Sequence, residues 1–425
     1  MKTGGCWVLG AMLAMGGCCV FDGGARRISM AEYRDKMAAA WIGQSVGVAF
    51  GEPTEFSARG ELVKDERMPK LWKPEMINST FHQDDVYVEM SFLETLQRSG
   101  LGVSCREAGI DFANSRYRLW CANANARDNL RRGIAAPYSS HPQFHKTTDD
   151  IDYQIEADFA GIISPGMPCG VLALGETFGR IMNYGDGLWA GEFVGAMYAE
   201  AFFTDDRLRI VEAGLRGIPA ESKYAEMVRD MVAWYKADPE DWRGAWKKAV
   251  EKYQSPAYVG RCSFKEIDVK INGAMVLLGY LWGNGDPDRT MYISTIGGFD
   301  SDCNPSSAVG VLFTSMGMSK VPSRYYEKLD HSAKWEFTNL DWKSLTALCE
   351  KLARENVVRH GGRIVADGDG VEWLVLPKKD VVPPAFLPSD NPAGVESELV
   401  KLSAAENERV LYKPCAKQGE QSERK

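Results

Sequence analysis

Between residues 28 and 356 the sequence repeatedly places apolar residues at the spacing of an amphipathic helix. Apolar residues recur three and four positions apart in four separate segments, residues 33–41, 224–235, 242–253 and 271–282. This spacing puts them on one face of a helix, which must then be buried against another element. With 425 residues, 45% of them hydrophobic, the chain can bury a large core. The pattern predicts an all-α body in which these aromatic residues form core.

Two glycines in the first predicted helix indicate close contact between helices. Gly43 and Gly47 follow the apolar face of residues 33–41 and lie one helical turn apart. Residues four apart share a helix face, so together they form a strip without side chains. We expect another helix to approach closely at this strip.

The sequence changes character after about residue 357. Segments 363–366 and 371–376 flank Asp-Gly-Asp-Gly at residues 367–370, which predicts a β-hairpin. The same four residues lack the remaining ligands of a calcium loop, which favours the turn. Beyond Pro383 the composition predicts an extended arm with a loose end. The expected organisation is a signal peptide over 1–18, a helical domain over 28–356, and a hairpin with a tail over 357–425.

The first twenty residues predict export. Lys2 precedes an apolar run over residues 7–15 that is too short to span a bilayer. Small residues then stand directly before Cys18, as in a bacterial lipoprotein signal, although Met15 occupies the position where Leu is usual. We expect an exported protein, lipid-anchored through Cys18 at the cell envelope, in the periplasm or outer membrane. An ordinary signal peptide is the alternative.

Charge and cysteine usage exclude several classes of partner. The net charge is −8 and no basic run occurs, so nucleic acid is not expected to bind, nor a membrane except through the lipid. The ten cysteines form no CxxC pair, and the five histidines lack the spacing of zinc ligands. Charge and cysteine usage therefore narrow the classes of partner without naming a ligand.

Two pairs of acids stand at predicted helix starts. Asp300 and Asp302 lie on a glycine-led turn before Asn304 and Pro305, residues that favour a helix start. Asp84 and Asp85 directly precede an earlier helix, where a single acid would suffice for capping. Adjacent carboxylates repel each other unless a cation lies between them. The four acids therefore predict a site for one or two hard cations, Mg²⁺ first and Mn²⁺ or Ca²⁺ as alternatives.

These motifs, in this order, resemble the ADP-ribosylglycohydrolase family, which includes the dinitrogenase reductase-activating glycohydrolases. A third motif agrees: residues 41–56 form a glycine-rich run that ends in Pro-Thr-Glu-Phe. The resemblance covers roughly residues 30–320. It implies an all-α orthogonal helical bundle that binds two Mg²⁺ and hydrolyses the bond at the anomeric carbon of an ADP-bound ribose.

The resemblance also implies roles for individual residues. By position, Asp84, Asp85, Asp300 and Asp302 match the metal-binding carboxylates of the family. Glu55 matches its loop glutamate, to which catalysis and substrate gating are assigned. Three positions depart from the family pattern, with Gln83 and Cys303 in place of threonines and Val48 in place of an acid. Gln83 can offer an amide oxygen, whereas the soft thiol of Cys303 is a poor partner for Mg²⁺.

Further candidate residues lie between the two acid pairs. In the glycine-bearing connection at residues 183–187, Tyr184 could stack on a sugar ring and Asp186 could accept hydrogen bonds from hydroxyls. The acids at residues 149–158 recur at helical spacing, which favours a solvated face. The alternative is that they line the cleft.

The resemblance implies a metal-dependent hydrolase of a glycosidic bond to a ribose-like sugar. The expected partner is thus a small-molecule or glycan substrate. Export favours an alternative, a glycosidase that acts on furanose-containing glycans with the same metal site. A catalytically inactive carbohydrate-binding lipoprotein is the third possibility. It is favoured if Gln83 and Cys303 prevent the site from binding its metal.

Overall fold

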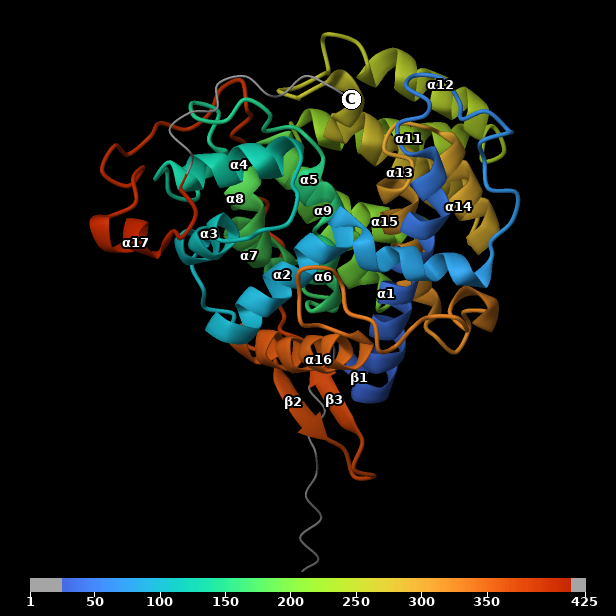
Figure 1. Ribbon diagram of the computed structural model, residues 1–425. Coiled ribbons are helices and arrows are strands. Elements are labelled where there is room, and N and C mark those ends of the chain that lie inside the picture. Colours follow the sequence, from blue (N-terminus) through green and yellow to red (C-terminus); the bar gives the residue numbers. More distant parts are fainter. Residues whose placement is uncertain (1–24, 414–425) are drawn as a thin grey trace, which may run out of the picture.

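The computed structural model describes residues 25–413, and the expected signal peptide with Cys18 lies outside this range. The described chain is largely helical with one small antiparallel sheet (Figure 1). This confirms the helical class predicted from the apolar spacing. Within residues 25–413 no helix is both long and apolar enough to cross a membrane.

The α-helices follow one another along the chain with short connections in most places. Their bounds are α1 Met30–Gly51, α2 Asp84–Ser99, α3 Cys105–Ala113, α4 Cys121–Arg131, α5 Asp152–Ile155, α6 Asp158–Ile162, α7 Pro168–Leu174, α8 Arg180–Met182, α9 Asp186–Ala201, α10 Arg207–Arg216, α11 Lys223–Ala237, α12 Trp242–Tyr253, α13 Val269–Trp282, α14 Pro287–Ile296, α15 Cys303–Met316, α16 Trp342–Arg359 and α17 Ala404–Arg409. A π-helical turn, Gly175–Gly179, joins α7 to α8.

Helices α9, α13 and α15 form the centre of the core. Nearly every residue of these three helices is buried, so they lack the polar face of a surface helix. Helix α1 packs on α15 more extensively than any other pair of elements. The remaining helices surround this centre, and Figure 1 shows α1 running from the sheet at one end of the molecule into the body.

The glycine strip of α1 is what allows this packing. A Cβ atom added at Gly43 would lie 2.6 Å from the carbonyl oxygen of Val309, and one at Gly47 would lie 2.2 Å from that of Pro305. Both distances are shorter than a van der Waals contact, so only glycine fits at either position. The expectation of a closely approaching helix is confirmed, and the partner is α15.

The sheet contains the predicted hairpin and one strand that was not predicted. Strands β2 (Arg363–Ala366) and β3 (Glu372–Val375) pair antiparallel, as expected from the Asp-Gly turn. Strand β1 (Arg27–Ser29) pairs with the other edge of β3, which gives the order β1-β3-β2. Three residues are too few to show an alternating pattern, so β1 left no signal in the sequence. The sheet contacts α16 and the start of α1.

Residues 383–413, here called the C-terminal arm, return along the helical body instead of extending from it. Arg106 of α3 donates hydrogen bonds to the carbonyl oxygens of Leu399 and Lys401, at 2.9 and 2.6 Å. It also pairs with Glu406 in α17. The described part of the arm is therefore fixed to α3, although its composition had suggested an extended segment.

Candidate metal and active site

A cavity of about 350 Å³ opens where the end of α1, the start of α2 and the start of α15 meet. Four carboxylic acids line it: Glu55, Asp84, Asp152 and Asp300. Its other walls are mainly apolar or aromatic, with Phe56, Trp120, Cys121, Ile151, Ile155, Phe264, Ile267 and Cys303. Arg59 is the one cationic side chain in this lining. The arrangement is a strongly acidic pocket with apolar sides.

The first acid pair is held at the start of α2. Asp85 is completely buried, and one of its carboxylate oxygens accepts a hydrogen bond from the backbone of Val86 at 2.9 Å. Its other oxygen accepts one from the hydroxyl of Ser306 in α15, also at 2.9 Å. This bond fixes the start of α2 to the start of α15. Asp84, less deeply buried, faces the cavity.

The second acid pair lies on a turn that is bound to the loop after α1. The turn needs left-handed backbone at Gly298 and Phe299, with φ of 80° and 64°. The amide of Phe299 donates to the carbonyl of Ala58 at 2.8 Å, and the amide of Phe56 donates to the carbonyl of Phe299 at 2.9 Å. These reciprocal bonds place Glu55, the neighbour of Phe56, beside the acids of the turn.

Cys303 lies between the two acid pairs. Its sulfur and one oxygen each from Asp84 and Asp85 all lie within 4.8 Å of one another. The same holds for its sulfur with one oxygen each from Asp300 and Asp302. The four acids that the sequence indicated therefore converge around this thiol.

Two buried oxygen atoms in this region support a role in cation binding. Among the described residues, Asp302 Oδ1 and Asn304 Oδ1 have no hydrogen-bond partner. Leaving a buried polar atom unpaired costs about 1–3 kcal/mol, so such atoms indicate a missing partner. Asn304 is held by a 3.0 Å hydrogen bond from its amide nitrogen to Asn272 Oδ1. Carboxylate and amide oxygens are the ligands that hard divalent cations prefer, so these residues fit such an ion.

The charges of the pocket are not balanced by protein groups. Burial, and after it the neighbouring Asp84 and Asp302, raises the pKa of Asp85 well above its ordinary value. Burial and the neighbouring Asp302 and Glu55 do the same for the pKa of Asp300. Burial raises the pKa of Asp302 to about 6. Deprotonating the whole cluster at neutral pH is therefore unfavourable unless a cation accompanies it.

Glu55 stands at the solvent side of the same cluster. It follows the short 3-10 turn Glu52–Thr54 that continues α1, and its side chain is exposed. Partial desolvation, followed by the charges of Asp302 and Asp84, raises its pKa to about 8. A carboxyl group in this position can hold or release a proton near neutral pH, as acid–base catalysis requires.

Asp152 is a lining residue that the favoured sequence interpretation missed. The acids at residues 149–158 were expected to form a solvated face, and this expectation is wrong because Asp149, Asp150, Asp152, Glu156 and Asp158 are all buried. Asp152 accepts hydrogen bonds from the backbone amides of Ala122 and Asn123, each at 3.1 Å. Burial raises the pKa of Asp152 to about 7. The alternative, that these acids line the cleft, holds for Asp152.

The two residues expected to bind substrate do not line this cavity. Tyr184 is buried, and its hydroxyl accepts a hydrogen bond from the amide of Ala393 in the C-terminal arm at 2.9 Å. Asp186 lines a different cavity, where its carboxylate lies 3.7 Å from the ammonium of Lys270. The structure thus brings together Glu55 and the four metal-site aspartates, and places Tyr184 and Asp186 apart from them.

Comparison with known proteins agrees with the geometry. The family described as ADP-ribosylglycohydrolase matches residues 29–361, which is most of the chain. The chain therefore belongs to the ADP-ribosylglycohydrolase family, and membership indicates a hydrolase of glycosyl bonds. A solved structure described as an "ADP-ribosylglycohydrolase-related protein complex" is similar at 15% identity and a TM-score of 0.46, covering 77% of this chain and 100% of that chain. Comparison with curated proteins found no significant match.

Proposed function

We propose that this protein is a metal-dependent hydrolase of a glycosidic bond to a ribose-like sugar, with its reaction centre in the acidic cavity. The observation that carries the proposal is the convergence of two carboxylate pairs on Cys303, with a buried unpaired oxygen on Asp302. Asp84, Asp85, Asp300 and Asp302 would hold the cation. Mg²⁺ is the first candidate because all four residues offer hard oxygen ligands.

A divalent cation bound there would supply charge stabilisation and a fixed point for the vicinal hydroxyls of the sugar. The protein groups would position the reactants and limit the access of water. The turn would hold Asp300 and Asp302, and with them the cation, in a fixed position, since both acids are buried and the turn is bound to the Glu55 loop. The apolar wall formed by Phe264 and Ile267 limits the access of water to the bond.

Glu55 is the proposed acid–base residue. Cleavage adds water across the glycosidic bond: the anomeric carbon gains a hydroxyl, and the leaving group takes a proton. A carboxyl group whose pKa is near 8 can give that proton to the leaving group at neutral pH. As a carboxylate it can then accept a proton from the attacking water, which balances the reaction.

A furanose-containing glycan is the second candidate substrate, and one feature of the lining favours it. Recognition of a diphosphate by side chains usually relies on several cationic groups. Of the residues that line this cavity, Arg59 alone is cationic, and it lies over the rings of Phe56 and Phe264 at 5.3 and 5.4 Å. A neutral sugar chain needs no such groups.

The experiment that tests the function combines stability and turnover. Mg²⁺ or Mn²⁺ should raise the melting temperature of the wild type but not of Asp302→Asn. No metal-induced difference between the two proteins would refute the metal-dependent function. With Mg²⁺ present, release of ADP-ribose from a modified arginine or serine peptide would identify the first substrate class. Release of reducing sugar from a panel of furanosides would identify the second, and glycan binding without turnover would identify an inactive binding protein.

We also propose, on the sequence alone, that the protein is exported and carries a lipid on Cys18. Small residues before Cys18 motivate this proposal. Mass spectrometry of the amino-terminal peptide after expression in a bacterial host would test it. A mature chain that begins upstream of Cys18, or that carries no lipid there, would contradict it.

A further inference from the structure

A second cavity, of about 500 Å³, lies among α9, α11, α13 and the C-terminal arm. The segment at residues 258–267 contributes to both cavities: Tyr258 and Arg261 line this one, and Phe264 and Ile267 line the acidic one. Its volume is within the range of small-molecule sites. It shares no lining residue with the acidic cavity.

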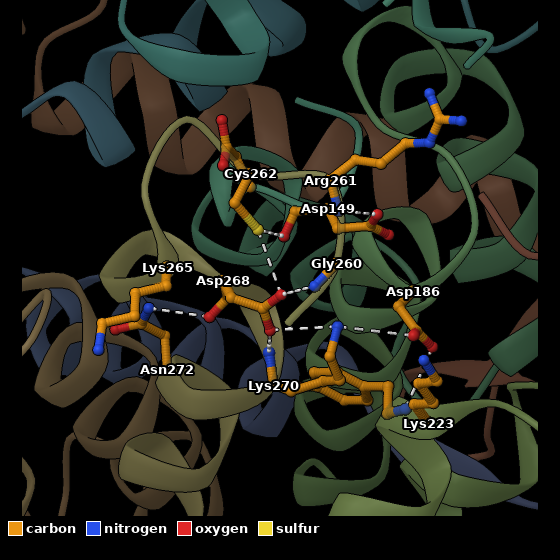
Figure 2. A network of polar contacts seen from close by, with 12 residues as sticks. Asp149, Asp186, Lys223, Gly260, Arg261, Cys262, Lys265, Asp268, Lys270 and Asn272 are labelled. Carbon is orange, nitrogen blue, oxygen red and sulfur yellow. Dashed lines mark hydrogen bonds and ion pairs between the residues drawn. The ribbon is translucent and has the colours of Figure 1, made fainter. Parts of the chain in front are cut away.

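A buried ammonium group forms part of the wall of this cavity. Lys270 is 1% exposed, and its Nζ lies 3.1 Å from Asp268 and 3.7 Å from Asp186, as Figure 2 shows. A charged lysine is buried only where carboxylates compensate for its lost hydration. Asp268 and Asp186, together with the nearby Asp149, supply this compensation, so an ammonium and carboxylates lie side by side at this wall.

The acids around Lys270 are fixed by backbone hydrogen bonds. Asp149 accepts from the amide of Arg261 at 2.8 Å, and Asp268 accepts from the amide of Gly260 at 2.7 Å (Figure 2). These bonds explain why Asp149 and Asp268 are present, because they hold residues 260–262 in place. They do not explain why a cavity is present, nor why Glu221, Lys223 and Asp390 also line it. The wall is thus built in advance of any ligand, which reduces the ordering cost of binding.

The C-terminal arm forms the other side of the cavity. Ser389 donates a hydrogen bond to Asp149 at 2.9 Å, and Phe386 stacks on Trp189 with ring centroids 5.6 Å apart. Phe386 is still 43% exposed, so its ring offers apolar surface at the cavity. The arm lies beyond residue 361, where the match to the family ends. The family domain alone therefore does not build this cavity.

The charges of the lining indicate the class of ligand. Its acids are Asp149, Asp186, Glu221 and Asp390. Its cations are Lys223, Arg261 and Lys270. Because four acids and three cations nearly balance, a simple anion or cation would meet like charge as well as opposite charge. A hydroxyl group both donates and accepts, so it can bridge a carboxylate and an ammonium.

We propose that this cavity is a second binding site, for a neutral polyhydroxylated molecule such as a mono- or disaccharide. Its hydroxyls would lie between Asp186 and Lys270, and one apolar face would rest on Phe386. A further hydroxyl would donate a hydrogen bond to Asp390, an exposed acid of the same lining. The proposal goes beyond the hydrolytic function and does not depend on it, since none of these residues takes part in the acidic cavity.

Binding to the full chain can be measured by saturation-transfer NMR and calorimetry in the presence of chelator. The probes are ribose, arabinose, galactose and sucrose, with inorganic phosphate and glycine as charged comparisons, each at about 10 mM because single-sugar affinities are in the millimolar range. We expect at least one neutral sugar to bind and the charged probes not to bind. Binding should persist in Asp302→Asn, which alters only the acidic cavity.

Two variants locate the binding. Val259→Trp places a large ring in the cavity and should abolish the sugar signal. Asp390→Ala removes an exposed lining acid and should raise the Kd about fivefold, the effect of one hydrogen bond. If Val259→Trp fails to fold, Asp390→Ala still decides the question. Failure of every neutral sugar to bind, binding of phosphate or glycine instead, or sugar affinity unchanged in Asp390→Ala would overturn the proposal.

Discussion

Gly51, the last residue of α1, lies in direct backbone contact with Ser301. A Cβ atom at Gly51 would lie 2.0 Å from the carbonyl oxygen of Ser301 and 2.4 Å from the Cα of Asp302. The hydroxyls of Thr54 and Ser301 also hydrogen-bond at 2.8 Å. The close approach of the end of α1 to the acid turn therefore depends on the absence of a side chain at Gly51.

Replacing this glycine should separate the two halves of the site. Gly51→Ala forces the backbone of α1 away from the turn, because the contacting atoms belong to the main chain and cannot rotate aside. We expect destabilisation of about 1–3 kcal/mol in chemical unfolding, as for other overpacked positions. We also expect a smaller Mg²⁺-induced rise in melting temperature. Gly394→Ala is the control, since a Cβ there meets nothing within 4 Å. Equal stability of the two variants would contradict this account.

Glu55→Gln should slow turnover without weakening cation binding. The substitution removes the proton that Glu55 transfers but leaves the four aspartates in place. General acid–base groups contribute about 100- to 10,000-fold to rate, so kcat should fall within that range. The Mg²⁺-induced shift in melting temperature should be unchanged. Glu52→Gln, a neighbouring exposed acid, is the matched control and should keep its activity. Loss of metal stabilisation in Glu55→Gln would show that Glu55 binds the cation.

Cys303→Ser should strengthen the binding of Mg²⁺. The sulfur of Cys303 lies among the oxygens of both acid pairs, and a hydroxyl is a harder ligand than a thiol. We expect the affinity for Mg²⁺ to rise on the order of tenfold, a change similar to that caused by altering groups next to metal ligands. Calorimetric titration of wild type and variant measures it. Cys105→Ser serves as the control because Cys105, the first residue of α3, does not line the acidic cavity. Unchanged or weaker Mg²⁺ binding in Cys303→Ser would show that the thiol does not lower the affinity of the site for Mg²⁺.

The attachment of the C-terminal arm should weaken in acid. The hydrogen bond from Arg106, 2.8 Å long at one oxygen, lowers the pKa of Glu406 to about 2. Because the folded pKa lies below the ordinary value of 4.5, the stabilisation is fully present above pH 4.5 and is lost as pH falls toward 2. Pepsin digestion between pH 4.5 and 2.5 should therefore cut the arm increasingly, before near-UV circular dichroism reports unfolding of the body. In Glu406→Gln the arm should be cut readily at both pH values.

The sequence predicted those features that depend on spacing within one segment. The i, i+4 glycines of α1 indicated a close helix, and the acid pairs before α2 and α15 indicated a cation site. The identity of the partner helix, α15, could not be read from α1 itself. It depends on contacts between residues more than 250 positions apart.

Asp152 shows why the remaining site residues were missed. Carboxylates at helical spacing ordinarily face water, and this is the correct expectation for most surface helices. Here the start of α4 presents the amides of Ala122 and Asn123, which satisfy the carboxylate inside the protein. The apolar neighbours Ile151 and Ile155 were the available signal, since an exposed acidic face would rarely carry them. Tyr184 was wrongly expected to bind substrate. Its glycine-bearing turn resembled a site loop, but its hydroxyl instead accepts a hydrogen bond from the C-terminal arm.

The length of α1 sets the distance between the amino-terminal end of the described chain and the cleft. Its 22 residues rise about 33 Å, with strand β1 at one end and the Glu55 loop at the other. The amino-terminal end of the described chain therefore lies at the sheet, a full helix length from the cleft. If the protein is held on a surface close to this end, the sheet would face that surface. The cleft would then be open on the far side, and substrates would not have to enter the space between the protein and the surface.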